Sequence, residues 1–337
     1  MSVWLVRAGR HGEREDIALN NNVAAIGWVE MPDMSDVKTK DELRELYMGI
    51  YPEKKKNAAS NHIGQLWTLL KRIQPGDLVI MPSKVRASIA IGEVKGPYKY
   101  RTDLPDNSRH TLPVKWINTD IPRTAFEQDL LYSMGAFMTV CQIKRNNAEE
   151  RIKKVLKGKI DDISEIEVLD DVPEEEEVDV ESVARDQIVD FVNRKFKGHE
   201  LSRLVEAVLQ AQGYVTEISK PGPDGGVDIL AGTGPMGFGE PRICVQVKSS
   251  QSAVDVTVLR GLQGSMTNFG AEQGLLVSWG GLTRAVYDEA RLNFFKVRLW
   301  DSSDLIKAIL KNYDNLSDSL QAELPLKRIW ALVIEEE

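Results

Sequence analysis

A run of acidic residues divides this chain and limits how it can fold. Between Asp161 and Glu181 there are twelve Asp and Glu residues and no Lys or Arg. Like charges at this density repel one another and resist packing into a core. We therefore predict two folded domains, residues 1–158 and 185–337, joined by a flexible acidic linker at 159–184. A DNA-mimicking or partner-binding role for the run is the alternative.

The charge of the folded parts differs from that of the whole chain. A formal net charge of −8 would ordinarily argue against nucleic acid as a partner. Subtracting the twelve acidic residues of the run from the chain's 51 leaves 39 against 43 basic residues, a formal charge of +4. The folded parts are therefore mildly basic, which permits DNA binding.

Apolar stretches and cysteines exclude several other classes. No apolar stretch approaches the roughly 20 residues that cross a bilayer, and the start, MSVWLVRAGR, becomes charged too soon for a signal peptide. We expect a cytoplasmic protein without membrane contact. Cys141 and Cys244 lie far apart and the four histidines are scattered, so neither a zinc site nor a disulfide framework is predicted. Any metal would be held mainly by oxygen.

The first domain has the pattern of a small, mostly β structure. Short runs rich in Val, Ile and Trp, separated by Pro and Gly, predict strands at 2–9, 22–29, 76–83, 87–94 and 112–117. Helical periodicity occurs at 40–51, 60–73, 125–134 and 148–158. Five or six strands with a few inserted helices indicate a small β-barrel.

The second domain alternates between helices and strands. Helices are predicted at 186–196, 199–214, 255–270, 283–294 and 304–313, and strands at 227–232, 242–250, 274–279 and 297–301. This order implies a central sheet flanked by helices, so the fold class is α/β, or α+β over the whole chain.

Three polar residues on neighbouring strands carry the candidate chemistry. Asp228 sits on one short strand, and Gln246 and Lys248 lie on the next. Because side chains alternate along a strand, Gln246 and Lys248 point to the same face, and an antiparallel pairing would bring all three together. A lysine among apolar neighbours is costly unless it is compensated, and Asp228 is the natural partner. An ion pair or an edge-strand lysine is the alternative reading.

These residues resemble a nuclease family in their order. A helix with Glu206, the segment DGGVD ending at Asp228, and the Q-x-K of Gln246 and Lys248 are similar to the Mrr-type branch of the PD-(D/E)XK nucleases. The segments 275–290 and 297–309 resemble that family's later strand-helix units. The resemblance covers roughly residues 185–330 and implies a restriction-endonuclease-like α/β/α domain.

The resemblance implies a role for each motif residue. Asp228 would bind Mg²⁺, Val247 would add its main-chain carbonyl, and Lys248 would orient or activate the attacking water. Hydrolysis of a phosphodiester requires charge neutralisation, a water of lowered pKa and a stabilised leaving oxygen, which one hard cation and one lysine supply.

One position lacks the carboxylate of the commoner motif. Gln246 stands in place of Glu, as in the Mrr branch, and this removes an anionic ligand although Mg²⁺ prefers carboxylates. Glu206, which borders the apolar stripe of its helix, is our candidate for the missing charge; a solvated helix glutamate is the alternative. Asp224 is a weaker candidate, because Pro-Asp-Gly-Gly is a good turn sequence.

The first domain resembles a family of small barrels. The segments 3–9, 24–29, 75–82 and 89–100 are similar to PUA/EVE-type domains, which hold a base, often a modified one, in an aromatic-lined pocket. We predict that Trp28, Trp116 and Tyr98 form the DNA or modified-base site, with Trp67 and Tyr100 as further walls; packing in the core is the alternative. Basic side chains that would follow the phosphates are Arg7, Arg10, Lys84, Arg86, Lys95, Lys99 and Arg101.

The sequence therefore predicts an Mg²⁺-dependent DNA endonuclease of the Mrr restriction type. It would cleave modified, foreign double-stranded DNA selected by the first domain, in restriction or antiphage defence. Cutting both strands needs two active sites, so we expect a homodimer. The alternatives are a DNA-binding or sensor protein with a degenerate nuclease fold, and a nuclease effector gated by a small nucleotide in the first domain.

Overall fold

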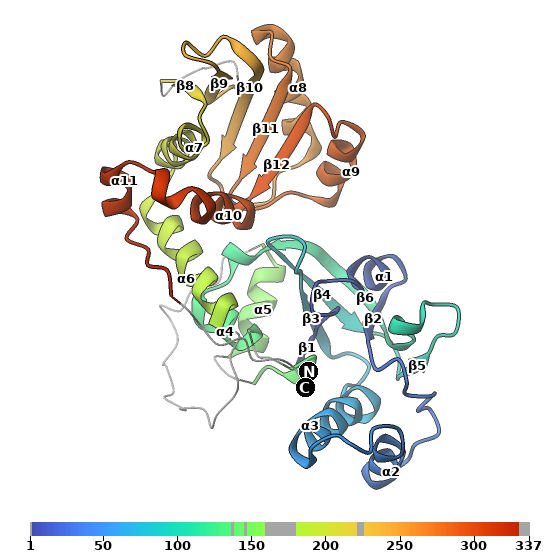
Figure 1. Cartoon of the computed structure of the whole chain (residues 1–337). Helices are drawn as coiled ribbons and strands as arrows, with labels where there is room; N and C mark the ends of the chain where they lie inside the picture. The colour runs from blue at the N-terminus through green and yellow to red at the C-terminus, as the bar shows by residue number, and fades with distance from the viewer. Residues whose placement is uncertain (1, 136–137, 145–146, 159–179, 221–225, 330–337) are drawn as a thin grey trace. The chain divides into compact units, whose positions relative to one another are not determined.

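The chain divides into two compact units, each with its own sheet (Figure 1). The structure is a computed structural model that describes residues 2–135, 138–144, 147–158, 180–220 and 226–329, without the side chains of 180–182. The units separate between Val183 and Ala184, and Pro122–Ala125 is grouped with the second unit. Most of the acidic run, and Asp224, lie outside the described residues, while helix α6 (Val180–Lys195) begins inside the predicted linker.

The first unit is built on a seven-stranded sheet in the order β2-β6-β4-β3-β1-β7, with β5 paired to β6. Its strands are β1 (Val3–Val6), β2 (Val23–Ile26), β3 (Leu78–Pro82), β4 (Ser88–Val94), β5 (Lys99–Tyr100), β6 (His110–Pro122) and β7 (Val140–Gln142). Its helices are α1 (Glu15–Asn20), α2 (Lys40–Ile50), α3 (Lys56–Trp67), α4 (Gln128–Met134) and α5 (Ala148–Leu156), with a π-helical turn at Thr68–Arg72.

This sheet does not close into the predicted barrel. In the described residues β2 and β7 end the sheet without pairing to each other, so it forms half a barrel. Helices cover the face that further strands would have closed: Leu43 and Tyr47 of α2 and Ile63 and Leu66 of α3 are buried in one core with strand residues. Because this amphipathic helical layer shields the apolar face of the sheet from water, the sheet does not have to close into a barrel to bury it.

The second unit is a mixed five-stranded sheet in the order β12-β11-β10-β9-β8. Its strands are β8 (Val215–Ile218), β9 (Ile229–Thr233), β10 (Gly239–Lys248), β11 (Gln273–Ser278) and β12 (Val297–Asp301). Its remaining helices are α7 (His199–Ala211), α8 (Val256–Phe269), α9 (Arg284–Leu292), α10 (Ser302–Asn312) and α11 (Asp318–Glu323). Strands β10, β11 and β12 run parallel, whereas β8, β9 and β10 pair antiparallel.

Helices cover both faces of this sheet, as predicted. Val245 and Val247 of β10 pack with residues of α7 and α10, while Cys244 packs with residues of α8 and α9. The side chains of β10 therefore alternate between two apolar layers, as expected for a strand buried on both faces. The result is an α/β/α sandwich (Figure 1).

Strand register defines two ends of this sheet. At one end, Lys248 of β10 pairs with Ser278 of β11, and Ser278 pairs with Asp301 of β12. Asp228, directly before β9, lies at the same end. We call this end the Lys248 edge. At the opposite end Val215 pairs with Gly232, the β9–β10 hairpin turns at 233–239, and β11 and β12 begin; we call it the hairpin edge.

No helix in the described ranges is long and apolar enough to cross a membrane.

Candidate active site

Asp228 is attached to the backbone of the Q-x-K strand. Its Oδ2 accepts a hydrogen bond from the Val247 N–H at 2.8 Å, and its own N–H donates to the Val245 carbonyl at 2.8 Å. The N–H and C=O of one strand residue leave the strand on the same side. The Val247 carbonyl therefore faces the Asp228 side of β10, so the antiparallel pairing brings Asp228 to the Q-x-K segment as predicted.

The Gln246 side chain is buried, and its carbonyl oxygen is unsatisfied. Gln246 is 8% exposed, and in the described residues its Oε1 has no hydrogen-bond partner. Most buried polar atoms do have one. Gly226, at φ +82°, closes over this amide: a Cβ added there would lie 3.6 Å from both the Gln246 Nε2 and the Ser265 Oγ of α8. Glycine at this position thus allows the backbone of residue 226 to lie close to the Gln246 amide in a left-handed conformation.

Lys248 lies half-buried at the end of β10. Its carbonyl accepts a hydrogen bond from the Trp279 N–H at 2.8 Å, which fixes the strand end against β11. No ion pair of its ammonium group is seen within the described ranges, whereas Asp228 has further interactions. The positive charge stays available for an anionic group such as a phosphate.

Glu206 lies on the other side of the sheet. It accepts a hydrogen bond from the Thr216 Oγ1 at 3.0 Å, and Thr216 pairs with Ala231, which belongs to the core under α7. Gln246 instead faces α8. In the part of the chain that the structure describes, no contact joins Glu206 to Asp228, and its role as a metal ligand stays a prediction.

The oxygen atoms at the Lys248 edge fit a hard cation. The described residues contain no group of three or more His, Cys, Asp or Glu that could hold a metal ion. The donors present are the Asp228 carboxylate, the Val247 carbonyl and the unsatisfied amide oxygen of Gln246. Such oxygens suit Mg²⁺, which commonly keeps one or two carboxylates and several waters.

Two further side chains at this edge were missed by the sequence analysis. In residues 184–329, as far as described, the buried side-chain atoms without a hydrogen-bond partner are Gln246 Oε1, Gln251 Oε1 and Trp279 Nε1. All three lie at the Lys248 edge, because Gln251 follows β10 and Trp279 follows β11. Sequence marks Trp279 only as apolar and Gln251 only as a loop residue, so only the hydrogen-bond pattern could single them out.

Two of the three predicted base-binding aromatics have their polar atoms satisfied within the first unit. Tyr98 is 7% exposed, and its hydroxyl hydrogen-bonds to the His110 Nδ1 at 2.8 Å. Trp116 is partly buried, and its indole N–H donates to the Ala18 carbonyl at 3.0 Å. These contacts favour packing in the core for both.

Trp28 has different surroundings. It is partly buried at the end of β2, has a φ of +62°, and meets His62 edge-on at 5.8 Å. A positive φ is uncommon in a bulky residue and often marks a functional site. Beside it, a Cβ on Gly27 would lie 3.5 Å from an Arg14 guanidinium nitrogen, and the buried Arg14 Nε has no hydrogen-bond partner among the described residues. Neither Arg14 nor His62 was predicted.

His62 connects Trp28 to two tyrosines. Its Nδ1 hydrogen-bonds to the Tyr47 hydroxyl at 2.7 Å, and the Tyr47 ring lies 4.8 Å from that of Tyr51. Burial, with a smaller contribution from Lys54, lowers the pKa of His62. A neutral imidazole at this position can exchange hydrogen bonds with an uncharged base edge.

Several of the basic residues predicted to follow phosphates already have acidic partners. Arg86 pairs with Asp120 at 2.9 Å, Lys95 with Glu93 at 2.6 Å and Arg101 with Asp103 at 2.6 Å. A paired cation is attracted less to a phosphate, so these three are weak members of the predicted phosphate track.

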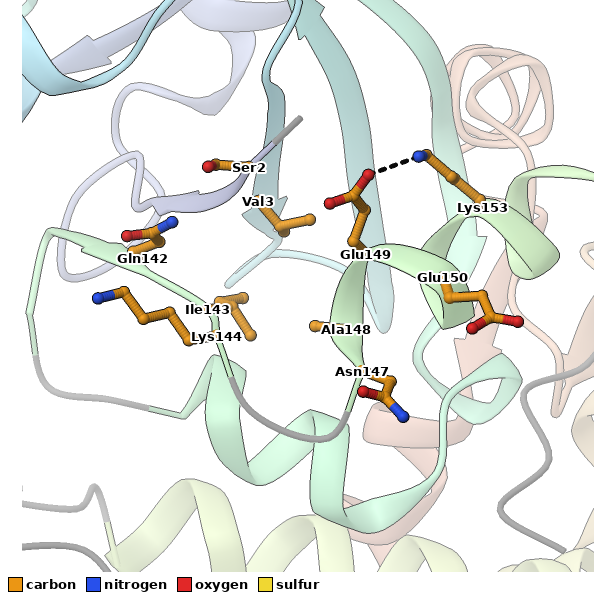
Figure 2. A pocket seen from close by; sticks show the side chains of 10 residues that line it. All are labelled: Ser2, Val3, Gln142, Ile143, Lys144, Asn147, Ala148, Glu149, Glu150 and Lys153. Atoms are coloured by element: carbon orange, nitrogen blue, oxygen red, sulfur yellow. Dashed lines mark hydrogen bonds and ion pairs between the residues drawn. The ribbon is translucent and has the colours of Figure 1, made fainter. Parts of the chain in front are cut away.

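A hollow of about 480 Å³ lies elsewhere in the first unit (Figure 2). It is formed between the start of β1, the end of β7 and the start of α5, and Lys153 pairs with Glu149 one turn away on α5 at 2.6 Å. Its lining carries charges of both signs and none of the predicted site residues: Ser2, Val3, Gln142, Ile143, Lys144, Asn147, Ala148, Glu149, Glu150 and Lys153. It indicates no particular ligand.

Comparison with family models assigns the second unit. Residues 193–309 match the Mrr catalytic-domain family, described as restriction endonucleases. The second unit carries a restriction endonuclease domain. The resemblance of this half to Mrr-type nucleases is thereby confirmed, and a DNA nuclease is supported. Domains of this kind generally use divalent metal ions.

The first unit matches a different family. Residues 4–144 match a domain family of unknown function, DUF8426. This match gives the unit no activity, and it does not confirm the PUA/EVE-like assignment.

Solved structures offer two weak likenesses. The DNA modification-dependent restriction endonuclease AspBHI is 14% identical, with 78% of this chain and 71% of that chain covered and a TM-score of 0.33. The MspJI restriction endonuclease in complex with a 27-mer oligonucleotide is 14% identical, with 81% and 69% covered and a TM-score of 0.31. TM-scores this low do not establish a shared overall fold. No curated protein sequence matches the chain.

Proposed function

We propose that the chain is an Mg²⁺-dependent endonuclease that cleaves modified double-stranded DNA, acting in restriction of foreign DNA. The observation that carries the proposal is the concentration of unsatisfied buried polar atoms, Gln246 Oε1, Gln251 Oε1 and Trp279 Nε1, at the same sheet edge as Asp228 and Lys248. Buried groups without partners are costly, and clusters of them are typical of sites whose partners come from a ligand.

The residues of the Lys248 edge divide the work of phosphodiester hydrolysis. The Asp228 carboxylate, oriented by the Val247 N–H, and the Val247 carbonyl would hold the cation. Mg²⁺, when bound, supplies charge stabilisation and lowers the pKa of a water. Lys248 orients the attacking water and offsets charge on the phosphate oxygens. The buried Trp279 indole N–H, which has no partner among the described residues, belongs to the core layer under α7 and α10 at the same sheet end.

The first unit would select the DNA. Contacts of the Lys248 edge with phosphate and metal do not distinguish one base from another, so recognition of a base requires a separate surface. Trp28 offers a stacking face, and His62 and Arg14 beside it offer hydrogen-bonding groups for the pairing edge of a flipped base. Tyr98 and Trp116 would support this site from the core.

One observation favours a second function. With Gln246 in place of a carboxylate, Asp228 is the acidic side chain that is seen hydrogen-bonded to residues 246–248 in the described part of the chain. A site with so little negative charge suits a DNA-binding or nucleotide-sensing defence effector whose nuclease domain is degenerate or gated by a ligand. A titration of the whole protein with Mg²⁺ or Mn²⁺, followed by calorimetry, tests the degenerate form of this alternative, because a degenerate domain binds neither ion.

The decisive variant for this proposal is Asp228→Asn. An asparagine keeps an oxygen that accepts the Val247 N–H, so the strand pairing is retained while the charge is lost. We expect wild type to cut modified plasmid only with a divalent cation, and Asp228→Asn to bind the same DNA without cutting it. Cleavage by Asp228→Asn at the wild-type rate would contradict the assignment.

A further inference from the structure

Exposed apolar side chains of the second unit gather at one end of its sheet. In residues 184–329, as far as they are described, nine large hydrophobic side chains are exposed, and two of them, Leu310 and Ile329, lie elsewhere. The other seven belong to the hairpin edge, the end opposite Lys248: Val215, Met236, Phe238, Phe269, Leu292, Phe294 and Phe295.

Strand order makes these residues a continuous row. Phe294 and Phe295 precede β12, Phe269 ends the helix before β11, Met236 and Phe238 form the β9–β10 turn, and Val215 begins β8. Neighbouring strands lie about 4.8 Å apart, so the row crosses roughly 20 Å of sheet edge.

The exposed area is larger than a monomer commonly leaves in water. The four phenylalanines of the row are 47–86% exposed, and because one phenylalanine offers about 150–250 Å², they alone present roughly 500 Å² of aromatic surface. Leu292, 85% exposed, and Met236, 72% exposed, extend it toward the about 800 Å² that each partner buries in a standard interface.

We propose that the hairpin edge is the interface of a homodimer. The charges of its two ends are complementary under a two-fold rotation. Residues 291–298, at the β12 end, contain Arg291, Lys296 and Arg298 and no acidic residue, whereas 215–218 and 233–240, at the other end, contain Glu217 and Glu240 and no basic residue. A two-fold axis through the middle of the edge sets the basic end of one copy against the acidic end of the other.

The middle and the basic end of the edge also have the character of an interface. Arg242 and Glu272 form an ion pair near the centre of the row. The Arg298 guanidinium stacks 4.0 Å from the Phe294 ring. Aromatic residues, Met and Arg are enriched where protein partners meet.

This dimer separates the two nuclease edges. The ten residues of β10, at about 3.3 Å each, put Lys248 roughly 30 Å from the hairpin edge. In the dimer the two Lys248 edges therefore face away from each other. Such a pairing cannot place two sites on opposite strands at one position of a duplex, so cutting both strands would need separate binding events. The interface does not depend on the proposed nuclease function.

The test is the mass of the whole protein in solution, measured without DNA by sedimentation velocity over a range of concentrations. We expect twice the chain mass of 37.8 kDa, and Phe238→Glu or Phe295→Glu should weaken the dimer about thirtyfold or more. Leu310→Glu, an equally apolar but separate exposed position, is the matched control and should leave the dissociation constant unchanged.

A charge exchange tests the orientation of the two copies. Lys296→Glu should weaken the dimer, and adding Glu240→Lys in the same chain should restore it, because each basic end would again meet an acidic one. Nuclease activity per chain should stay at the wild-type level in every variant. A monomeric wild type, or a dimer that tolerates both Phe238→Glu and Phe295→Glu with unchanged melting curves, would overturn the proposal.

Discussion

In the first unit, the polar atoms of Tyr98 and Trp116 are bound by His110 and by the Ala18 carbonyl. At the Lys248 edge of the second unit, Gln246 and Trp279 are as deeply buried, yet each has a polar atom without a partner among the described residues. The two regions contain residue types that look equally functional in sequence. The difference teaches that hydrogen-bond satisfaction, more than residue type, separates a structural aromatic from a candidate ligand site.

The largest expected effect comes from removing the lysine of the Q-x-K strand. Lys248→Ala should reduce cleavage by about a thousandfold or more while changing DNA affinity little, because its ammonium group acts on the reacting phosphate and water. Plasmid nicking and a DNA-binding titration measure the two quantities. Lys311→Ala, an exposed lysine on α10, is the control and should keep both. Equal cleavage by the two variants would show that Lys248 takes no part in the reaction, and the Lys248 edge would then differ from the first unit in hydrogen bonding alone.

Substitution of Trp28 and of Trp116 in the first unit should separate recognition from packing. Trp28→Ala should lower discrimination between modified and unmodified DNA by roughly ten- to a hundredfold, since stacking of a base is worth about 1–3 kcal/mol. Trp116→Ala should instead destabilise the unit by about 2–4 kcal/mol, because its ring packs in the core and its N–H is bound. Competition cleavage and thermal melts distinguish these results; a Trp28 variant that loses only stability would place Trp28 in the core.

Gln246 offers a smaller effect in which stability and activity move independently. Gln246→Leu removes an amide oxygen that has no partner in the described structure, so the melting temperature should not fall, while cleavage should drop by about tenfold. Gln246→Glu should keep activity and gain more thermal stability from added Mg²⁺ than wild type, because it adds an anionic ligand. If Gln246→Leu unfolds the protein, Gln246 is a structural amide.

The smallest effect concerns pH. Burial lowers the pKa of His62 and of His110 below the value of an unfolded histidine. Their contribution to stability is therefore present above about pH 6.5 and is lost as the pH falls toward the folded-state pKa values. Between pH 7.5 and 5.5 we expect the wild-type melting temperature to fall more than that of His62→Gln. His11→Gln, at an exposed histidine, should follow wild type.

The sequence predicts the framework of the second unit well. Apolar periodicity is strong in α7, whose buried residues follow one stripe, and the short strands around Asp228 and Lys248 are bounded by Gly and Pro. Strand β8 was missed, because Val215–Ile218 is a four-residue edge strand whose side chains are exposed or half-buried, with no apolar face to reveal it. That Gln246 and Lys248 share one side of their strand could be predicted, because side chains alternate along a strand.

Features that depend on tertiary contacts could not be predicted. The half-open first sheet results from coverage by α2 and α3, which local patterns do not show. Arg14 and His62 join Trp28 only through the fold, since they come from the α1 and α3 segments of the chain. Glu206 lies near the apolar stripe as expected, yet register places it against Thr216 on the opposite face from Gln246.

The central claim is that the second unit hydrolyses DNA which the first unit selects. The most direct measurement compares whole protein with an isolated fragment of residues 184–337, on matched modified and unmodified plasmid DNA, with and without Mg²⁺. We predict that the whole protein cuts modified DNA only in the presence of Mg²⁺, and that a folded fragment either fails to cut or cuts both DNAs alike. A fragment that cuts with the selectivity of the whole protein would contradict the account.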